Sequence, residues 1–501
     1  MNLRNKRAVL VLILGAGYGV FFFVLNVFKL RSFFSFEWAD DAAENQVIYN
    51  IAAFFNPHQT VFLGKYFFGH FTPVYFLIAV FYRIFPSIFT LYFIISFLYG
   101  LCAFIVYMLA REFLDENQAF FTALIYLLFA PLHYVNLGTL DGNIFALPLL
   151  FTAWYFIFKK KFLPYAVFMA LSCLCKEDIP LGVFLLGIYL LIKKYPKKWW
   201  LTTCLFSLLY FIFAMIMLPQ FRLEHHLAAS AKTQYFRYLD ISTFREIFKF
   251  IFSGAFINAL FDFSKLKAFS VFLYPLLFLP LLTWEFYLAL PFLLEIILHP
   301  SFSNDTSYYF SPVIPFAFVG FIFALKRLNA RILIPAVFCL AVISNLAPNF
   351  LGPLPKDAQK ESISDPGFLK VNNIFDSKIY TLSQDNKPAW DIIKMLPDNA
   401  SVTASGDLLP ALSSRKNLYE FGLNVGGGAG AFYARGYSYP AYSADYIFIH
   451  KKNLANGFGG KYVYLGEDLI AKEVKKLIER DYKVMRQERD FILMRKINAE
   501  S

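Results

Sequence analysis

The chain has 501 residues, of which 58% are hydrophobic, 20% aromatic and only 16% charged. A soluble domain carries about 25% charged residues, so this composition excludes a soluble enzyme, a disordered chain, a coiled coil and a collagen for most of the length. The net charge of +12 does not indicate nucleic-acid binding, because the lysines fall in short clusters between apolar runs. We therefore predict a polytopic membrane protein that contacts membrane lipids and binds no nucleic acid.

Apolar runs of near-spanning length recur through the first 350 residues. A bilayer core needs about 20 apolar residues per helix. We predict about eleven transmembrane helices, at residues 8–28, 88–110, 117–136, 143–158, 162–175, 179–195, 199–218, 267–283, 284–299, 309–326 and 331–347. No small-residue cleavage site follows the first run, so we interpret it as a retained helix and not as a signal peptide. All five cysteines lie in apolar segments, which argues against a disulfide framework.

Basic clusters between these runs predict the orientation in the membrane. They precede the first span and separate the fourth from the fifth, the sixth from the seventh and the tenth from the eleventh: Arg4, Lys6 and Arg7; Lys159, Lys160 and Lys161; Lys193, Lys194, Lys197 and Lys198; Lys326, Arg327 and Arg331. Basic loops stay on the cytoplasmic side. We therefore expect a multi-pass protein of the cell (inner or plasma) membrane with a cytoplasmic N-terminus and an extracytoplasmic C-terminus.

That orientation requires that the apolar stretch at residues 71–85 does not cross. The stretch contains Arg83 and ends at Pro86, so we predict an interfacial or re-entrant helix, with a true span as the alternative. Residues 29–87 then form one outer loop, and residues 219–266 form a second.

The fold class is predicted to be mainly α, with a transmembrane bundle at residues 1–350 and an extracytoplasmic α/β domain at residues 351–501. Charged residues, prolines and glycines become more frequent after about residue 352. In this domain we predict strands at residues 401–405, 445–450 and 461–465, a helix at 467–481 and a hairpin at 482–495. The glycine-rich run at 426–430 is interpreted as a loop and not as a phosphate-binding motif.

Charged residues beside a membrane are costly, so their positions are the main clue to function. The first cluster contains Asp40, Asp41 and Glu44, and it is followed by Gln46 and Asn50. On a helix Asp40 and Glu44 lie on one face. A carboxylate at the outer interface can act as a general base or bind a divalent ion. An acidic helix end that simply faces water is the alternative.

Further charged residues fall on the same predicted side. His70 enters the apolar stretch, either to hydrogen-bond a helix start or to contact a phosphate. Lys176, Glu177 and Asp178 are flanked by apolar runs, and a lysine suits a phosphate oxygen; a solvated turn is the alternative. Asp141 and Arg222 are also predicted to lie outside. We interpret this shared side as evidence for one extracytoplasmic site.

These residues resemble a known family in matching order. Asp40 with Gln46 and Asn50, the run His70-Phe71-Thr72-Pro73 and the triplet Lys176-Glu177-Asp178 are similar to a family of prokaryotic membrane proteins catalogued as a domain of unknown function. In the C-terminal region the similarity continues through residues 396–402, 409–415 and 445–446. That family is placed in the GT-C superfamily of membrane glycosyltransferases.

The resemblance implies a bundle of many transmembrane helices, an acidic first outer loop and an outer soluble domain. It implies an inverting transfer of a sugar from a polyprenyl-phosphate-type donor to an external acceptor, which could be a glycan, a lipid or a protein. Asp40 becomes the candidate general base, with Asp41 in reserve. His70, Lys176 and Arg222 become candidate ligands of the donor phosphate, and the supporting residues are Glu44, Gln46, Asn50, Asp141, Glu177 and Asp178.

The sequence also departs from the family. Asn45 stands where members tend to have an aspartate, and a Phe-His-Pro-like motif near Asp141 is missing. No cofactor is assigned from the residues, and a divalent metal such as Mg²⁺ or Mn²⁺ stays open. The alternatives from other classes are a transporter or flippase of lipid-linked or polar solutes and a non-catalytic scaffold. A transporter would show charges near the midplane and inverted repeats, and neither is evident.

Overall fold

The computed structural model describes residues 3–35, 38–61, 70–223, 249, 252–298, 308–346, 375, 377–421, 443–451, 474–479 and 481–497. The chain divides into two compact units. The helical unit comprises Met1–Val24, Gly69–Tyr75 and Tyr92–Leu354, and the α/β unit comprises Leu25–Phe68, Phe76–Leu91 and Pro355–Ser501. Most of the predicted first outer loop therefore belongs to the same unit as the C-terminal domain.

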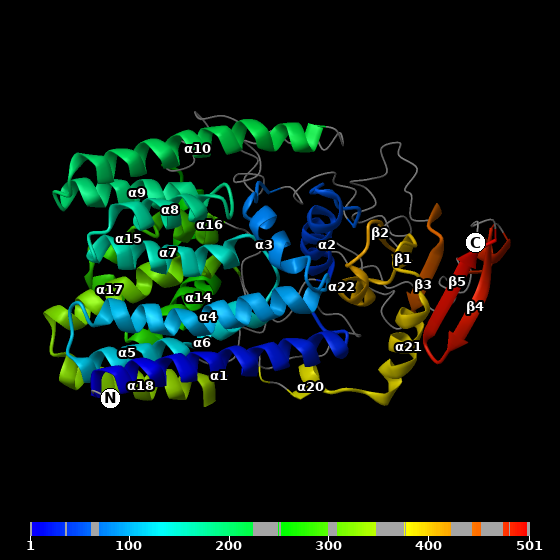
Figure 1. Ribbon diagram of the computed structural model, residues 1–501, viewed down its shortest axis with the longest axis horizontal. Coiled ribbons are helices and arrows are strands. Elements are labelled where there is room, and N and C mark those ends of the chain that lie inside the picture. Colours follow the sequence, from blue (N-terminus) through cyan, green and yellow to red (C-terminus); the bar gives the residue numbers. More distant parts are fainter. Residues whose placement is uncertain are drawn as a thin grey trace. The chain divides into compact units, whose positions relative to one another are not determined.

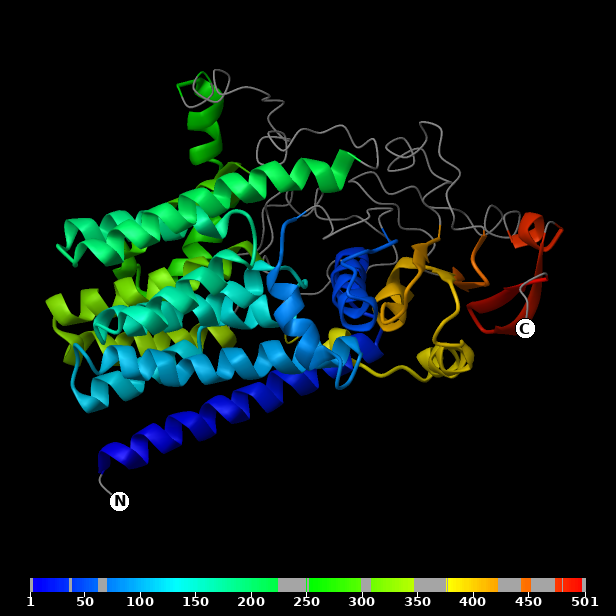
Figure 2. The same cartoon turned by 45° about the horizontal axis from the view of Figure 1, so that its top comes forward.

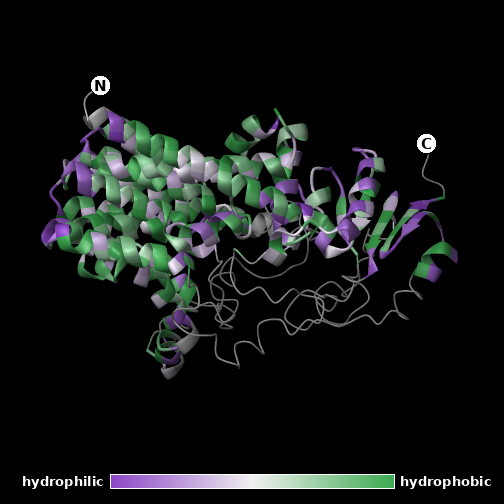
Figure 3. Cartoon of the chain, turned by 90° about the horizontal axis from the view of Figure 1, so that it is seen from below, coloured by the Kyte–Doolittle hydropathy of each residue, from purple (hydrophilic) through white to green (hydrophobic). Residues whose placement is uncertain are grey.

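Apolar helices build the helical unit (Figure 1). They are α1 (Leu3–Arg31), α4 (Ile88–Ala110), α5 (Glu116–Leu127), α6 (Ala130–Leu137), α7 (Asn143–Phe158), α8 (Phe162–Cys173), α9 (Ile179–Ile192), α10 (Lys197–Leu223), α13 (Gly254–Leu260), α14 (Phe263–Leu273), α15 (Trp284–Tyr287), α16 (Leu290–Leu298), α17 (Val313–Arg327) and α18 (Ala330–Leu346). Short turns join α7 to α8 and α9 to α10, and each pair packs side by side. Hydrophobic residues cover these helices along their length (Figure 3), as lipid contact requires.

Fewer helices are long enough to cross a membrane than the sequence predicts. Among the described residues, three helices are long and apolar enough to cross a bilayer, within α1, α4 and α10. The pair α5 and α6 makes a fourth if it is one span bent by 41°. The apolar helices α7, α8, α9 and α18 are shorter. The mainly helical membrane architecture is confirmed, but eleven spans are not.

Two predicted spans, residues 267–283 and 284–299, are wrong as continuous helices. α14 ends at Leu273, and the short 3-10 helices η2 (Tyr274–Leu276) and η3 (Leu279–Leu282) follow it. Pro275 and Pro280 lack the N–H that a helix needs, and Leu277 and Phe278 between them take left-handed φ angles of 52° and 54°. The second segment is divided into α15 and α16.

The stretch at residues 71–85 contains helix α3 (Val74–Tyr82). Its nine residues rise only about 14 Å, which is far short of the roughly 30 Å bilayer core. This length agrees with the prediction that the stretch does not cross.

The basic turns of the helical unit all lie at one end of it. Lys159 pairs with Glu112 at 2.6 Å, and Lys326 lies 4.8 Å from the ring centre of Phe113, so the α7–α8, α17–α18 and α4–α5 turns are adjacent. Arg7 of α1 interacts with Tyr107 near the end of α4. Figure 2 shows the N-terminus at the same end as these turns. This gathering is what a common cytoplasmic side would produce.

The C-terminal part of the α/β unit contains a five-stranded sheet in the order β2-β1-β3-β5-β4. The strands are β1 (Val402–Ala404), β2 (Leu418–Glu420), β3 (Tyr446–His450), β4 (Tyr482–Glu488) and β5 (Phe491–Lys496). β1 runs parallel to β2 and β3, whereas β5 is antiparallel to β3 and β4. The predicted strands at 401–405 and 445–450 and the hairpin at 482–495 are confirmed. β2 was not predicted, because its three residues are too short for an alternating pattern.

The other C-terminal predictions are tested only in part. Residues 474–479 of the predicted helix are helical, and the remainder of it up to residue 473 lies outside the described residues. The predicted strand at 461–465 and the glycine-rich run at 426–430 also lie outside them. Short helices complete the unit: α20 (Ser377–Tyr380), η5 (Gln384–Asn386), α21 (Lys387–Met395), η6 (Gly406–Leu408) and α22 (Leu409–Leu412).

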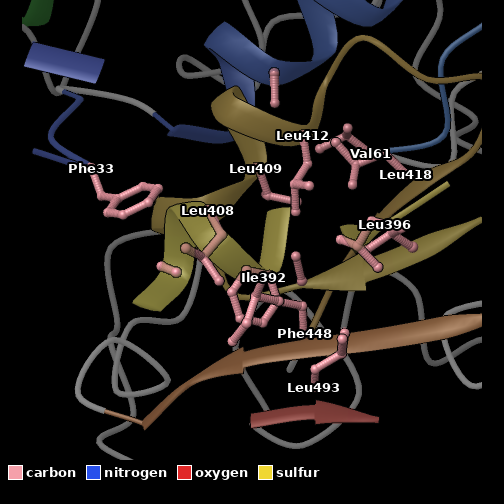
Figure 4. Packing of buried hydrophobic residues seen from close by; sticks show 14 of the residues in the cluster. Phe33, Val61, Ile392, Leu396, Leu408, Leu409, Leu412, Leu418, Phe448 and Leu493 are labelled. Atoms are coloured by element: carbon pink, nitrogen blue, oxygen red, sulfur yellow. The ribbon is translucent and has the colours of Figure 1, made fainter. Parts of the chain in front are cut away.

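Helix α2 (Trp38–Phe54) belongs to the core of the α/β unit. Its residues Ala39, Ala42 and Ala43 are buried in one cluster with side chains of the sheet and of α21, α22 and η6. Figure 4 shows Phe33 and Val61, which flank α2 in sequence, in the same cluster as Leu412 and Phe448. The small alanines allow the helix backbone to approach α22 closely, and hydrophobic burial holds the two parts together.

Candidate functional site

Three loops meet at one end of the helical unit. They are residues 70–73 before α3, residues 138–142 between α6 and α7, and residues 174–178 between α8 and α9. The N–H of Val74 donates to the carbonyl of Leu174 at 3.0 Å. Gly142 lies so close to the third loop that a Cβ there would be 2.2 Å from the carbonyl oxygen of Cys175. A glycine at 142 is therefore required for this convergence.

His70 and Glu177 form the partly exposed pair of the site. Nδ1 of His70 lies 2.8 Å from Oε1 of Glu177, whose side chain is 1% exposed against 17% for His70. The other oxygen of Glu177 accepts the N–H of Phe71 at 2.9 Å. Burial alone would raise the pKa of Glu177, but His70, Lys176 and the Phe71 N–H together lower it to about 2. Glu177 is thus a fixed anion that orients the His70 imidazole.

Lys176 and Asp141 form a second, fully enclosed pair. Nζ of Lys176 lies 3.1 Å from Oδ2 of Asp141, and the two side chains are 1% and 5% exposed. Asp141 also accepts the N–H of Asn143 at 2.8 Å, which fixes its carboxylate at the start of α7. Burial would lower the pKa of Lys176, but Asp141 and Asp178 hold it well above its ordinary value. Lys176 is therefore a permanent cation.

Aromatic rings and a further carboxyl group surround Lys176, and the sequence analysis missed them. Nζ of Lys176 lies 5.1 and 5.2 Å from the ring centres of Tyr308 and Tyr309, within the range of a cation–π contact. Glu295 of α16 interacts with Asp178. A glutamate inside a predicted apolar span is costly, and that signal could have identified Glu295. The two tyrosines follow no charged motif and gave no such signal.

The charge balance of this cluster shapes its chemistry. Burial raises the pKa of Asp178 even though Lys176 opposes the shift. The four carboxyl groups of Asp141, Glu177, Asp178 and Glu295 outnumber the two basic groups, His70 and Lys176. Among the described residues no group of three or more His, Cys, Asp or Glu side chains is arranged to hold a metal ion. The cluster can thus offer the Lys176 cation and an oriented imidazole, but both basic groups already have carboxylate partners.

The acidic residues of α2 lie in the α/β unit. Asp41 is fully buried and accepts the hydroxyl of Ser35 at 2.6 Å. Asp40 is partly exposed, whereas Glu44 is buried. Of the three carboxylates, Asp40 is therefore the one with access to solvent.

The amides of α2 bind the segment that follows α22. Nε2 of Gln46 donates to the carbonyls of Arg415 and Lys416 at 3.2 and 3.0 Å, and Asn50 donates to the Lys416 carbonyl at 3.3 Å. Asn45 donates to the hydroxyl of Ser413 at 2.8 Å. Asn45, where the resemblance leads one to expect an aspartate, is thus a buried structural donor in this protein.

The structure therefore assigns the predicted site residues to two groups. His70, Asp141, Lys176, Glu177 and Asp178 meet in the helical unit. The residues of α2 belong to the α/β unit: Asp40, Asp41, Glu44, Gln46 and Asn50. Arg222 falls in the last turn of α10, and its side chain lies outside the described part of the chain.

Comparison with known proteins gives the family. The profile of the predicted membrane proteins named DUF2079 matches residues 45–461. The chain belongs to the DUF2079 family. The match includes His70, Asp141 and Lys176 as well as Gln46 and Asn50. No curated protein matches the chain significantly in sequence.

Solved structures give the fold of this DUF2079 protein. ArnT from Cupriavidus metallidurans, bound to undecaprenyl phosphate, aligns with a TM-score of 0.54 and 11% identity over 97% of this chain and 98% of that one. The oligosaccharyltransferase of Archaeoglobus fulgidus in its apo form aligns with a TM-score of 0.44 and 12% identity over 89% of this chain and 69% of that one. These neighbours are GT-C glycosyltransferases, and the likeness to ArnT shows that the DUF2079 chain has a GT-C-like fold.

Proposed function

We propose that this DUF2079 protein is a membrane glycosyltransferase that moves a sugar from a polyprenyl-phosphate donor to an acceptor on the extracytoplasmic side. The observation that carries the proposal is the enclosed cluster of Lys176, Asp141, His70 and Glu177, in a chain with the fold of ArnT. The cluster lies in loops at the ends of helices whose other ends carry the basic turns. An extracytoplasmic position follows if those turns are cytoplasmic.

The donor phosphate would be stabilised by His70 and Lys176. His70 is the more accessible of the two; Glu177 orients its ring, which when protonated can donate to a phosphate oxygen. Lys176 would contribute its charge at short range in a low-dielectric site. As the sugar C1–O bond breaks, the electron pair goes to the lipid phosphate, and both cations stabilise the growing negative charge.

Asp40 would take the proton of the acceptor. The acceptor oxygen forms the new bond to C1 on the face opposite the departing phosphate, and its proton passes to the Asp40 carboxylate. Asp41 is less suited to this role, because its carboxylate is buried and already accepts the Ser35 hydroxyl. Gln46 and Asn50 would contribute indirectly, because their hydrogen bonds to the segment after α22 hold α2, and with it Asp40, in place within the α/β unit.

Transfer from a panel of undecaprenyl-phosphate sugars to membrane acceptors tests the proposal, with the full-length protein in vesicles. We expect Asp40→Asn to lower the rate of transfer by about 100-fold or more, the usual contribution of a general base. Asp391→Asn, which removes a partly exposed carboxylate of α21 in the same unit, is the matched control and should keep the wild-type rate. Full activity of Asp40→Asn would reject Asp40 as the base.

Binding of undecaprenyl phosphate, followed by native mass spectrometry, tests the donor site without any sugar. We expect His70→Gln to weaken binding by about tenfold, since a charge-assisted hydrogen bond contributes roughly 1.5–3 kcal/mol. The double variant Lys176→Met/Asp141→Leu removes both charges of the enclosed pair together, and it should also bind the lipid phosphate weakly. Unchanged binding in both variants would reject this cluster as the donor site.

A further inference from the structure

A second cluster of polar groups lies in the α/β unit, at the edge where the parallel strands end. Ser405 and Asp407 follow β1, Glu420 ends β2 and His450 ends β3. Because β1 is parallel to both neighbours, the carboxyl ends of all three strands meet at one edge. Such edges are the usual place for ligands in open α/β sheets. None of these residues was singled out from the sequence.

Asp407 and His450 form an oriented pair at this edge. Nδ1 of His450 lies 2.6 Å from Oδ2 of Asp407, and the two side chains are 13% and 0% exposed. The backbone N–H of His450 donates to the hydroxyl of Ser405 at 2.8 Å, and its ring stacks on Phe491 with 4.4 Å between ring centres. The imidazole is thus held from three directions, as a group with a binding role requires.

Two acceptor atoms of this pair are without partners among the described residues. Oδ1 of Asp407 is buried and accepts no hydrogen bond there. In the tautomer with Nδ1–H directed to Asp407, Nε2 of the His450 ring carries a lone pair, for which the described part of the chain supplies no donor. A buried carboxylate oxygen without a donor is costly. A ligand that supplies O–H groups would satisfy both atoms.

Gly406 brings an aromatic ring and another carboxyl group to the same place. A Cβ on Gly406 would lie 3.1 Å from the six-membered ring of Trp38 and 3.5 Å from Oε1 of Glu420. Trp38 is the first residue of α2, two positions before Asp40. Burial raises the pKa of Glu420 to about 7. The Asp407 carboxylate would repel a phosphate or a carboxylate, and a largely protonated Glu420 offers such an anion no positive charge. A neutral ring with hydroxyl groups, by contrast, meets hydrogen-bonding groups and an aromatic surface.

We propose that Asp407, His450, Glu420 and Trp38 form a binding site for an uncharged, hydroxyl-rich sugar ring. On the proposed function, which this inference extends, the ring belongs to the acceptor, so that the acceptor is a glycan or glycoside rather than an anionic group. Asp407 has two roles: its Oδ2 orients His450, and its unpartnered Oδ1 accepts a hydroxyl group of the ring. His450 accepts a hydroxyl proton in a hydrogen bond, and no bond to the sugar is made or broken here.

Saturation-transfer NMR on the full-length protein in nanodiscs tests the site with two probes, methyl β-D-glucopyranoside and glucose 6-phosphate. The glucoside should receive saturation and the phosphate should not. We expect His450→Gln and Asp407→Asn each to weaken glucoside binding by about fivefold, the loss of one hydrogen bond to the ligand. The control Asp391→Asn should leave it unchanged. Absence of glucoside binding, equal binding of both probes or wild-type affinity in both variants would overturn the proposal.

A second measurement needs no variant. Diethyl pyrocarbonate modifies accessible neutral imidazoles, and peptide mass spectrometry gives the rate at His450. The glucoside should slow this rate at least about threefold, whereas glucose 6-phosphate should not; an unprotected His450 counts against the site. Neither measurement requires the lipid-linked sugar donor or catalytic turnover. Sugar binding without any transfer would thus reject the proposed function alone, and transfer without sugar binding would reject this site alone.

Discussion

Lys176 and Asp141, which are separated by two helices in the sequence, form an ion pair of 3.1 Å that is almost completely enclosed by protein. Such a pair stabilises a fold less than its geometry suggests, because both charges lose their hydration. Removal of one partner is much worse, since a lone charge stays buried. This asymmetry gives the first prediction.

Asp141→Asn should destabilise the protein by up to roughly 3–5 kcal/mol, the usual effect of breaking a buried ion pair, because Asp178 is then the main carboxylate that faces the buried Lys176 charge. The double variant Lys176→Met/Asp141→Leu should be closer to the wild type than Asp141→Asn is. Thermal unfolding in detergent measures both. Lys475→Ala is the control, because Lys475 pairs with Glu479 on an exposed surface. If the double variant were the less stable of the two, the pair would have to contribute net stability.

Glu177 should make stability depend on pH in the acidic range. Its pKa is lowered from 4.5 to about 2 in the folded protein, so its contribution is fully present above about pH 4.5 and is lost as the pH falls toward 2. At neutral pH this shift corresponds to about 3 kcal/mol. The difference in melting temperature between wild type and Glu177→Gln should therefore shrink between pH 4.5 and 2. A constant difference over this range would contradict the His70–Glu177 interaction.

Helices α1 and α4 pack so closely at Gly15 and Gly100 that a side chain at Gly100 should not fit between them. A Cβ there would lie 2.1 Å from the carbonyl oxygen of Gly15, and one at Gly15 would lie 2.4 Å from that of Gly100. Small residues allow such close contacts between membrane helices. We expect Gly100→Val to lower stability by about 1–3 kcal/mol through overpacking. Gly17→Val is the matched control, because nothing lies within 4 Å of a Cβ at Gly17.

Gln46 should act through folding and not through chemistry. Gln46→Leu would remove donors from the carbonyls of Arg415 and Lys416 and an acceptor from the Thr60 N–H. We expect a loss of about 1–3 kcal/mol, since these groups would be left without partners. Hydrogen exchange of residues 409–420 measures the local opening. Any loss of sugar-transfer activity should equal the fraction of protein that is unfolded. A larger loss in fully folded protein would place Gln46 in the active site.

The sequence determined the membrane character, the positions of most helices and several strands, because long apolar runs and alternating patterns are local signals. The positions of basic residues such as Lys159 and Lys326 also predicted that these turns lie together at one end of the helical unit, because basic loops stay on one side of the membrane. The prediction failed at Pro275 and Pro280, where the prolines interrupt the helix. Apolar composition alone cannot distinguish a continuous helix from a broken one.

Which side chains pair with each other could be seen only in the tertiary structure. His70 meets Glu177 across 107 positions, and Gln46 binds a carbonyl 370 positions away; no local pattern specifies such partners. Asp407 and His450 carry no motif and become adjacent only because two parallel strands end at one edge. Polar groups beside an apolar core must find partners, and chain topology decides which ones they meet.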